Sequence, residues 1–238
     1  MCFCFHTEEL SAQTYSYNKT LKLDLPLSLG GGLGWMYSNR LKKRKVGLSE
    51  EEIGLLNIDD ISKFDRVSCR NWSLGAHKAS NVFLLSSYVL PYTLLLDKNI
   101  RGGDNLGNIA LFTFETVAIN SAVTGIIKEL VRRKRPLLYN PNCPIEKKLH
   151  RDATSSFISG HTSNVAALSF MTAQMYSDLH PNSKGRGYVW GTAALIPAVT
   201  ALLRVKAGRH FPTDVIAGYL VGAAVGILVP RLHRVRVE

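Results

Sequence analysis

The amino-acid sequence predicts an all-α protein, a polytopic membrane helical bundle with about six transmembrane helices. Long stretches of the 238-residue chain carry almost no charge, although the mean hydropathy is only +0.03. The charged residues are crowded into the segments between those stretches, so the average hides a strong segregation. Because about 20 apolar residues in a helix cross the hydrocarbon core of a bilayer, such stretches are expected to span a membrane.

Five stretches define the strongest predicted spans, and a sixth is weaker. The five cover about residues 79–96, 108–131, 161–179, 187–204 and 212–230. The weak one, at 25–38, is short and contains Gly30, Gly31, Gly32 and Gly34; glycine is tolerated in membrane helices but weakens the prediction. One such run is compatible with a buried helix of a soluble protein, whereas five in one chain favour a membrane protein.

The polar segments suggest how the chain is divided. Residues 1–78 form an N-terminal segment with the weak span and an amphipathic helix, 79–232 form the core of membrane helices, and 233–238 form a basic tail. The amphipathic helix is predicted from Ser49 and Glu52, which have the spacing of a capping box, and from Ile53, Leu56, Ile61 and Phe64 after them. It would lie on the membrane surface or on the bundle, or be an ordinary solvated helix. Three prolines predict a loop over 132–159.

Composition and cysteine usage limit the possible partners. The chain has 29 Lys and Arg against 18 Asp and Glu, a net charge of +11, which favours an anionic partner: a nucleic acid, an anionic lipid or a phosphorylated substrate. Cys2, Cys4, Cys69 and Cys143 have no metal-ligand spacing beyond the weak Cys2/Cys4 pair, so we expect no zinc site and no required disulfide. Residues 1–13 do not have the convincing pattern of a signal peptide, although Ser11-Ala12-Gln13 is compatible with the remnant of a cleavage site.

The polar residues best suited to chemistry fall at one end of the predicted bundle. If the spans alternate in direction, Lys128 and Arg135 follow the end of one helix, and Ser159, Gly160 and His161 begin the next. Arg204 ends the following helix, while His210 and Asp214 lie at the start of the last. Arginine and lysine bind phosphate oxygens, helix N-termini favour anions, and histidine can serve as nucleophile or general acid. Together they predict a phosphate-binding site.

Three ordered motifs resemble a known family. Lys128-x6-Arg135-Pro136, Ser159-Gly160-His161 and Arg204-x5-His210-x3-Asp214 are similar to the signature of the type 2 phosphatidic acid phosphatase superfamily, which includes the vanadium-dependent haloperoxidases. The motifs cover residues 128–214, and the surrounding helices extend the likeness over roughly 80–230. Ile158 and Leu203 depart from the usual pattern, at positions where proline and a hydroxyl residue are common. Neither departure removes a charged or acid–base group.

The resemblance implies a role for each motif residue. His210 would attack phosphorus to form a phosphohistidine, with Asp214 orienting its ring, and His161 would protonate the leaving oxygen and then help activate water. Lys128, Arg135, Arg204, Ser159 and the Gly160 N–H would bind the phosphoryl oxygens. With three cations and a helix end available, no metal and no other cofactor is expected.

Each basic or histidine residue also has a simpler interpretation. A membrane-helix Lys or Arg is commonly a snorkelling anchor, and His210 with Asp214 is compatible with a structural pair. Residues 132–134 are expected to meet anionic headgroups, Lys206 and Arg209 to lie at the periphery, and the basic run 40–45 to form a juxtamembrane patch rather than a nucleic-acid site. The order and spacing of the motifs favour the catalytic interpretation.

The expected function is a membrane phosphatase acting on a lipid phosphate or diphosphate. A vanadate-binding haloperoxidase-like enzyme and a non-catalytic lipid-binding membrane protein are the alternatives. The motif end carries 20 Lys and Arg against 9 at the other end, which by the positive-inside rule places it in the cytoplasm. The resemblance implies the opposite: a bacterial inner-membrane protein whose active site faces the periplasm or exterior. We expect the latter, because several of these charges would be used in phosphate binding. The sequence predicts neither the lipid nor the oligomeric state.

Overall fold

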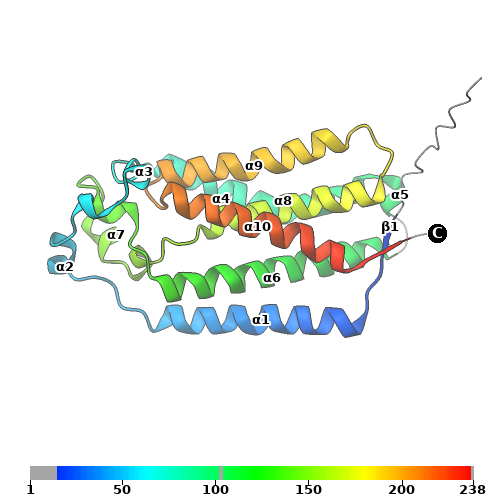
Figure 1. Ribbon diagram of the computed structural model, residues 1–238, viewed down its shortest axis with the longest axis horizontal. Helices are drawn as coiled ribbons and strands as arrows, with labels where there is room; N and C mark the ends of the chain where they lie inside the picture. Colours follow the sequence, from blue (N-terminus) through cyan, green and yellow to red (C-terminus); the bar gives the residue numbers. More distant parts are fainter. Residues whose placement is uncertain (1–14, 102–103, 237–238) are drawn as a thin grey trace, which may run out of the picture.

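The computed structural model describes residues 15–101 and 104–236, and six long helical segments run side by side along its long axis (Figure 1). The prediction of an all-α bundle is confirmed. The six segments are α1 (Leu21–Lys43), α4 (Leu74–Val89) continued by the 3-10 helix η2 (Leu90–Leu96), α6 (Asn105–Val131), α8 (Gly160–Leu179), α9 (Arg186–Lys206) and α10 (Pro212–Leu232). Each contains one of the six predicted spans.

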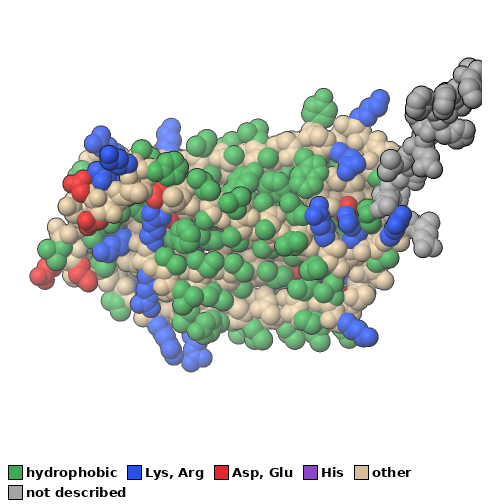
Figure 2. Space-filling model, viewed as in Figure 1, with side chains coloured by type: hydrophobic (Ala, Val, Ile, Leu, Met, Phe, Trp, Pro, Cys, Tyr) green, Lys and Arg blue, Asp and Glu red, His purple; other side chains and the backbone are tan. Residues whose placement is uncertain are grey.

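Four of these segments are long and apolar enough to cross a membrane by length and composition: 74–96, 105–139, 186–206 and 212–232. Side chains exposed along them include Leu85, Phe114, Leu195 and Leu220. Figure 2 shows hydrophobic side chains over the middle of the bundle and Lys and Arg gathered toward its two ends. This is the pattern of an integral membrane protein.

Helix α8 lies at the centre of the bundle, which explains why its apolar character is weaker than that of its neighbours. Its polar side chains are buried and bonded to other helices: Ser163 Oγ donates to Asn120 Oδ1 of α6 at 2.7 Å. Against α8, α10 presents Gly218, Gly222 and Gly226, one turn apart, and a side chain at any of them would collide with the α8 backbone. The glycines therefore let α10 and α8 approach closely.

The end of the bundle drawn at the left of Figure 1 is covered by the two polar segments, 44–73 and 132–159. The predicted loop over 132–159 contains only short helices: η3 (Pro136–Tyr139), α7 (Ile145–Leu149) and η4 (Arg151–Thr154). The prediction of one amphipathic helix after Ser49 is wrong. The capping box forms, but the helix that it starts, α2 (Glu50–Gly54), ends after five residues, and the rest of the predicted helix is divided into η1 (Ile58–Asp60) and α3 (Lys63–Arg66).

The predicted helix is divided because polar side chains cap the start of two further short helices after α2. Asn57 caps η1 by accepting from the Asp59 N–H, and Ser62 caps α3 by accepting from the Asp65 N–H. Ile53 and Leu56 then pack on a small apolar cluster around Leu137. These two side chains therefore help to pack the segment 44–73 against the segment 132–159, and they do not form the apolar face of one continuous helix.

The opposite end of the bundle is closed by a two-stranded antiparallel sheet. Strand β1 (Tyr15–Tyr17) pairs with β2 (Arg234–Arg236) with Ser16 opposite Val235, so part of the predicted basic tail forms a strand. The short helix α5 (Lys98–Arg101) lies at the same end. Of the cysteines, Cys69 and Cys143 are buried and free, whereas Cys2, Cys4 and the rest of 1–13 lie outside the described residues.

Candidate active site

A cavity of about 510 Å³ opens at the end of the bundle where α6 and α9 finish and α8 and α10 begin. Six of the eight predicted site residues line it: Lys128, Arg135, Gly160, His161, Arg204 and His210. The remaining two, Ser159 and Asp214, are fully buried behind its wall. Antiparallel packing thus brings all three sequence motifs to one end of the bundle.

His210 lies in the turn between α9 and α10, just before Pro212 begins the last helix. Its Nδ1 is 2.8 Å from the carbonyl oxygen of Ser156, which can only accept a hydrogen bond, so Nδ1 carries the proton. The lone pair is then on Nε2, which lies 3.3 Å from Nη1 of Arg135. Burial, with the cations of Arg135, Lys128 and Arg204, holds the pKa of His210 well below its usual range. The ring is therefore neutral and nucleophilic at neutral pH.

Asp214 was expected to orient the His210 ring, but it forms no direct hydrogen bond with that ring. Its Oδ2 is 3.7 Å from His210 Nδ1. Instead, Oδ2 accepts from Ser156 Oγ at 2.5 Å and from the Phe211 N–H at 2.8 Å. Since Ser156 also supplies the carbonyl that fixes His210, the carboxylate holds the ring through that residue.

Three cations converge on the cavity without acidic partners. Arg135 donates to the carbonyl oxygens of Asp152 and Arg209 at 2.7 and 2.9 Å, and Lys128 donates to the carbonyl of Ile158. Nη1 of Arg204 lies 3.1 Å from His77 Nδ1, while its buried Nε has no hydrogen-bond partner. Within the described residues, none of the three forms an ion pair with a carboxylate, so the site is arranged for an external anion.

The start of α8 supplies the remaining predicted residues. Ser159 is the N-cap, and its Oγ accepts from the Thr162 N–H at 3.5 Å, so in this structure the hydroxyl caps the helix. Gly160 lies on the cavity wall beside Lys128. His161 also faces the cavity, and its Nε2 is 2.9 Å from Oδ1 of Asn81 on α4. This helix N-terminus is directed at the cavity and favours negative charge there.

The predictions for the basic residues Arg133 and Lys45 are wrong. Arg133 does not meet headgroups: it forms ion pairs with Asp214 at 2.6 Å and Asp65 at 2.7 Å and stacks on the ring of Phe211. Lys45, assigned to the surface basic patch, is buried in an ion pair with Glu129 of α6 at 3.1 Å. Burial of the carboxylates explains both, because each needs a compensating cation.

Other cavity residues were not identified from the sequence. Arg209, expected at the periphery, lines the cavity, as do His77 from α4 and Trp35, Ser38 and Lys42 from α1. For His77 and Arg209 a signal existed, since both lie at the motif end of a predicted span. No local pattern marks the α1 residues, because the motifs lie elsewhere in the chain.

A family model and several known proteins match parts of the chain. The model of the PAP2 superfamily matches residues 109–238, more than half of the chain. The chain is 32% identical to the lipid A 4'-phosphatase of Porphyromonas gingivalis over 84 residues. This aligned region covers 35% of this chain and 32% of that protein. Over 149 residues it is 28% identical to phosphatidylglycerophosphatase B of Bacillus subtilis, 60% of this chain and 67% of that protein. The chain thus spans about a third of the length of the first relative.

Among solved structures, the fold is similar to a transmembrane PAP2-type phosphatidylglycerolphosphate phosphatase from Bacillus subtilis. The two chains are 20% identical, and the TM-score is 0.48. The likeness covers 89% of this chain and 92% of that one.

Proposed function

This chain belongs to the PAP2 superfamily, and from that premise we propose that it hydrolyses a lipid phosphate or diphosphate through a phosphohistidine intermediate on His210. One observation carries the proposal: the Nε2 lone pair of a neutral His210 lies beside Arg135 in a cavity that Lys128 and Arg204 also line. A nucleophile and three cations in one cavity suit attack on a phosphoryl group.

In the first step, Nε2 of His210 attacks phosphorus as the bond from phosphorus to the lipid oxygen breaks. The bound phosphoryl anion stabilises the imidazolium form of His161, which burial and the site cations otherwise disfavour. The lipid oxygen takes a proton from this imidazolium and leaves as an alcohol, or as a phosphate monoester when the substrate is a diphosphate. Nδ1–H of His210 stays bonded to the Ser156 carbonyl, which helps to stabilise the positive charge that the ring gains. Lys128, Arg135 and Arg204 bind the other phosphoryl oxygens.

In the second step, water replaces the histidine. Neutral His161 accepts a proton from water, the water oxygen attacks phosphorus, and the bond between phosphorus and Nε2 breaks. Inorganic phosphate leaves, and both histidines return to their starting protonation states. The three cations stay fixed during both steps, so they supply the electrostatic stabilisation that metal ions provide in other phosphoryl-transfer enzymes.

A lipid substrate follows from the position of the cavity. It lies at the ends of membrane helices, where headgroups are found, and α1 contributes Trp35, whose side chain is also exposed on the outer surface. Both curated relatives are named as phosphatases of lipid substrates. Phosphatidate, phosphatidylglycerophosphate, lipid A phosphates and isoprenyl diphosphates all place a phosphoryl group at this depth.

We place the active site on the periplasmic or exterior face of a bacterial inner membrane. The excess of basic residues at this end argues against that orientation only if those residues are free to act as topology signals. Several are engaged instead: Arg133 and Lys45 are in ion pairs with buried carboxylates, and Arg135 and Arg204 are buried at the cavity. The remaining charges are available to bind anionic headgroups.

Phosphate release in detergent micelles tests the proposal. We expect release from phosphatidate or an isoprenyl diphosphate with excess EDTA present, and inhibition by vanadate, a phosphate mimic. Activity that disappears with EDTA and returns with Mg²⁺ would contradict the metal-free mechanism. Halide oxidation with added vanadate and peroxide would favour a haloperoxidase, and no turnover of any lipid phosphate would favour a lipid-binding protein.

Asp214→Asn is expected to lower turnover on the order of 10²-fold, less than the loss of the nucleophile, because the carboxylate positions His210 through Ser156. Removing the negative charge also lowers the pKa of His210 further, so the acidic limb of the kcat/KM profile should move to lower pH. The measurement is kcat/KM as a function of pH.

Asp65→Asn is the matched control for this variant. It also removes a buried ion-pair partner of Arg133, at 2.7 Å, but has no hydrogen bond to Ser156 or Phe211. Its turnover and pH profile should stay close to wild type even where its Tm falls. Equal losses of turnover in both variants would show that Asp214 acts only in folding.

A further inference from the structure

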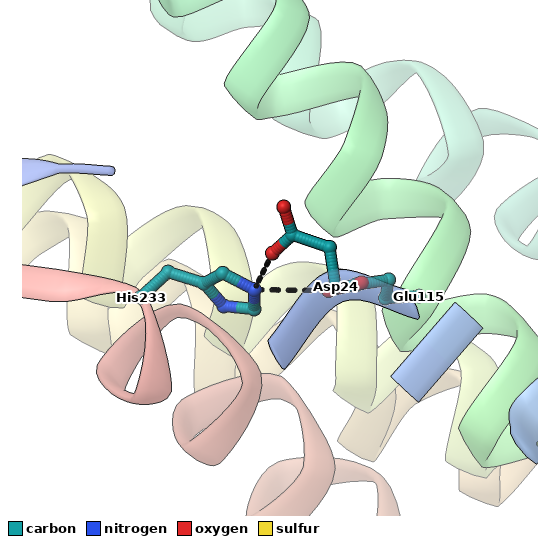
Figure 3. A group of neighbouring side chains, drawn as sticks. All are labelled: Asp24, Glu115 and His233. Carbon is teal, nitrogen blue, oxygen red and sulfur yellow. Dashed lines mark hydrogen bonds and ion pairs between the residues drawn. The ribbon is translucent and has the colours of Figure 1, made fainter. Parts of the chain in front are cut away.

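A second cluster of functional groups lies at the end of the bundle opposite the cavity. Asp24 of α1, Glu115 of α6 and His233, which follows α10, each direct a ligand-type atom to a common point, and these atoms lie within 4.8 Å of one another (Figure 3). His233 Nε2 is 2.9 Å from Asp24 Oδ1 and 3.4 Å from Glu115 Oε2. None of these residues takes part in the proposed reaction.

The ring of His233 is held as metal-binding histidines usually are. Its Nδ1 lies 2.8 Å from the carbonyl oxygen of Val229, which can only accept, so Nδ1 carries a proton and Nε2 faces the two carboxylates. The Phe112 ring, 4.4 Å away between centroids, packs against the imidazole and fixes its plane. A backbone acceptor for the second ring nitrogen is the common outer contact of a metal-bound histidine.

The described residues alone do not supply enough hydrogen-bond donors for the two carboxylates of this cluster. Glu115 is fully buried; its Oε1 accepts from Ser28 Oγ at 3.1 Å, but its Oε2 accepts no hydrogen bond. A protonated His233 has one Nε2–H, and the 2.9 Å contact directs it to Asp24. Across residues 15–101 and 104–236, no Lys or Arg forms an ion pair with either carboxylate. Two carboxylates thus share one histidine, and one buried oxygen has no donor.

We propose that Asp24, Glu115 and His233 bind one divalent transition-metal ion, best matched by Zn²⁺. Tetrahedral zinc with bonds of about 2.0–2.2 Å places its ligands roughly 3.3–3.5 Å apart. The distance from His233 Nε2 to Glu115 Oε2 is 3.4 Å, and the 2.9 Å distance to Asp24 Oδ1 would lengthen slightly when the ion binds. An imidazole ligand favours zinc over Mg²⁺ or Ca²⁺. The two carboxylates balance the ion's charge, and the 15% exposed side chain of Asp24 gives it a route of entry. The ion would join α1, α6 and the end of α10.

Metal content of the full-length protein tests the site. The chain, without a polyhistidine tag, is purified in detergent, stripped with chelator, incubated with Zn²⁺ and freed of excess metal before elemental analysis. Wild type should retain one Zn²⁺ per chain, and His233→Gln and Glu115→Gln almost none. Zn²⁺ should raise the Tm of wild type by several degrees and leave both variants unchanged. If His233→Gln is unstable, Asp24→Asn gives the same test at the most exposed ligand.

Two controls locate the ion. His180 at the same end pairs with a single carboxylate, Asp97, at 2.8 Å and stacks on Tyr176, so His180→Gln should keep the zinc. His210→Ala should also keep it. Zinc lost with His210→Ala would place the metal in the active site and overturn the proposal. No zinc on wild type, or zinc kept by both His233→Gln and Glu115→Gln, would overturn it equally. If the metal-free, folded protein still releases phosphate, the ion takes no part in the phosphatase reaction.

Discussion

His210→Ala is expected to abolish phosphate release, by roughly 10⁶-fold in kcat, because the variant has no nucleophile for the covalent step. His210 lies at the cavity wall with its Nε2 beside Arg135. The truncated side chain leaves space continuous with the cavity, so the protein should stay folded. Initial rates on phosphatidate and an isoprenyl diphosphate, together with the Tm, measure both effects.

The covalent intermediate gives this prediction a second measurement. With substrate labelled in its phosphate, rapid quenching of wild type should leave acid-labile, base-stable label on the protein, and His210→Ala should carry none. His150→Ala is the control, because His150 is exposed at the same end of the bundle and its side chain is 59% accessible. Equal release by wild type and His210→Ala would move the nucleophile elsewhere or reveal a contaminating phosphatase.

Arg204→Ala is expected to lower kcat/KM by about 10²–10³-fold, since one positioned donor to a developing oxyanion contributes about 2.7–4 kcal/mol in a transition state. Arg204 is buried, contacts Ser80 Oγ at 3.2 Å and has no acidic partner among the described residues. Arg204→Lys keeps the charge but loses the planar fork, so it should fall between alanine and wild type.

The stability of the same variant separates a functional from a structural role. A buried guanidinium without a carboxylate disfavours the folded state until an anion binds. Arg204→Ala should therefore unfold at the wild-type Tm or above it, while the rise in Tm that vanadate causes in wild type should shrink. A variant that loses activity together with several degrees of Tm would assign Arg204 to folding, and unchanged turnover would exclude it from the site.

The sequence alone determined the six long helices, the end of the bundle that carries the chemistry and six of the residues that line the cavity. The reason is that charge segregation and helix length are local properties, and alternation of antiparallel spans then decides which ends meet. On this basis Lys128, His161, Arg204 and His210 were predicted to lie at one end of the bundle, and all four line the cavity there. The glycines at 25–38 made the first span uncertain, because nothing local shows that Gly31 and Gly34 pack against Ala118 and Ala122 of α6.

Only the tertiary structure decided which partners the buried charges have. Asp214 reaches His210 through Ser156, and Arg133 is held between Asp214 and Asp65, 68 residues away in the chain. Lys45 pairs with Glu129, and His233 lies against Asp24 from the other end of the sequence. Such pairs form because a buried charge needs a partner, but which residue supplies it depends on how whole helices pack. No local sequence pattern therefore indicates which residue is the partner of a given buried charge.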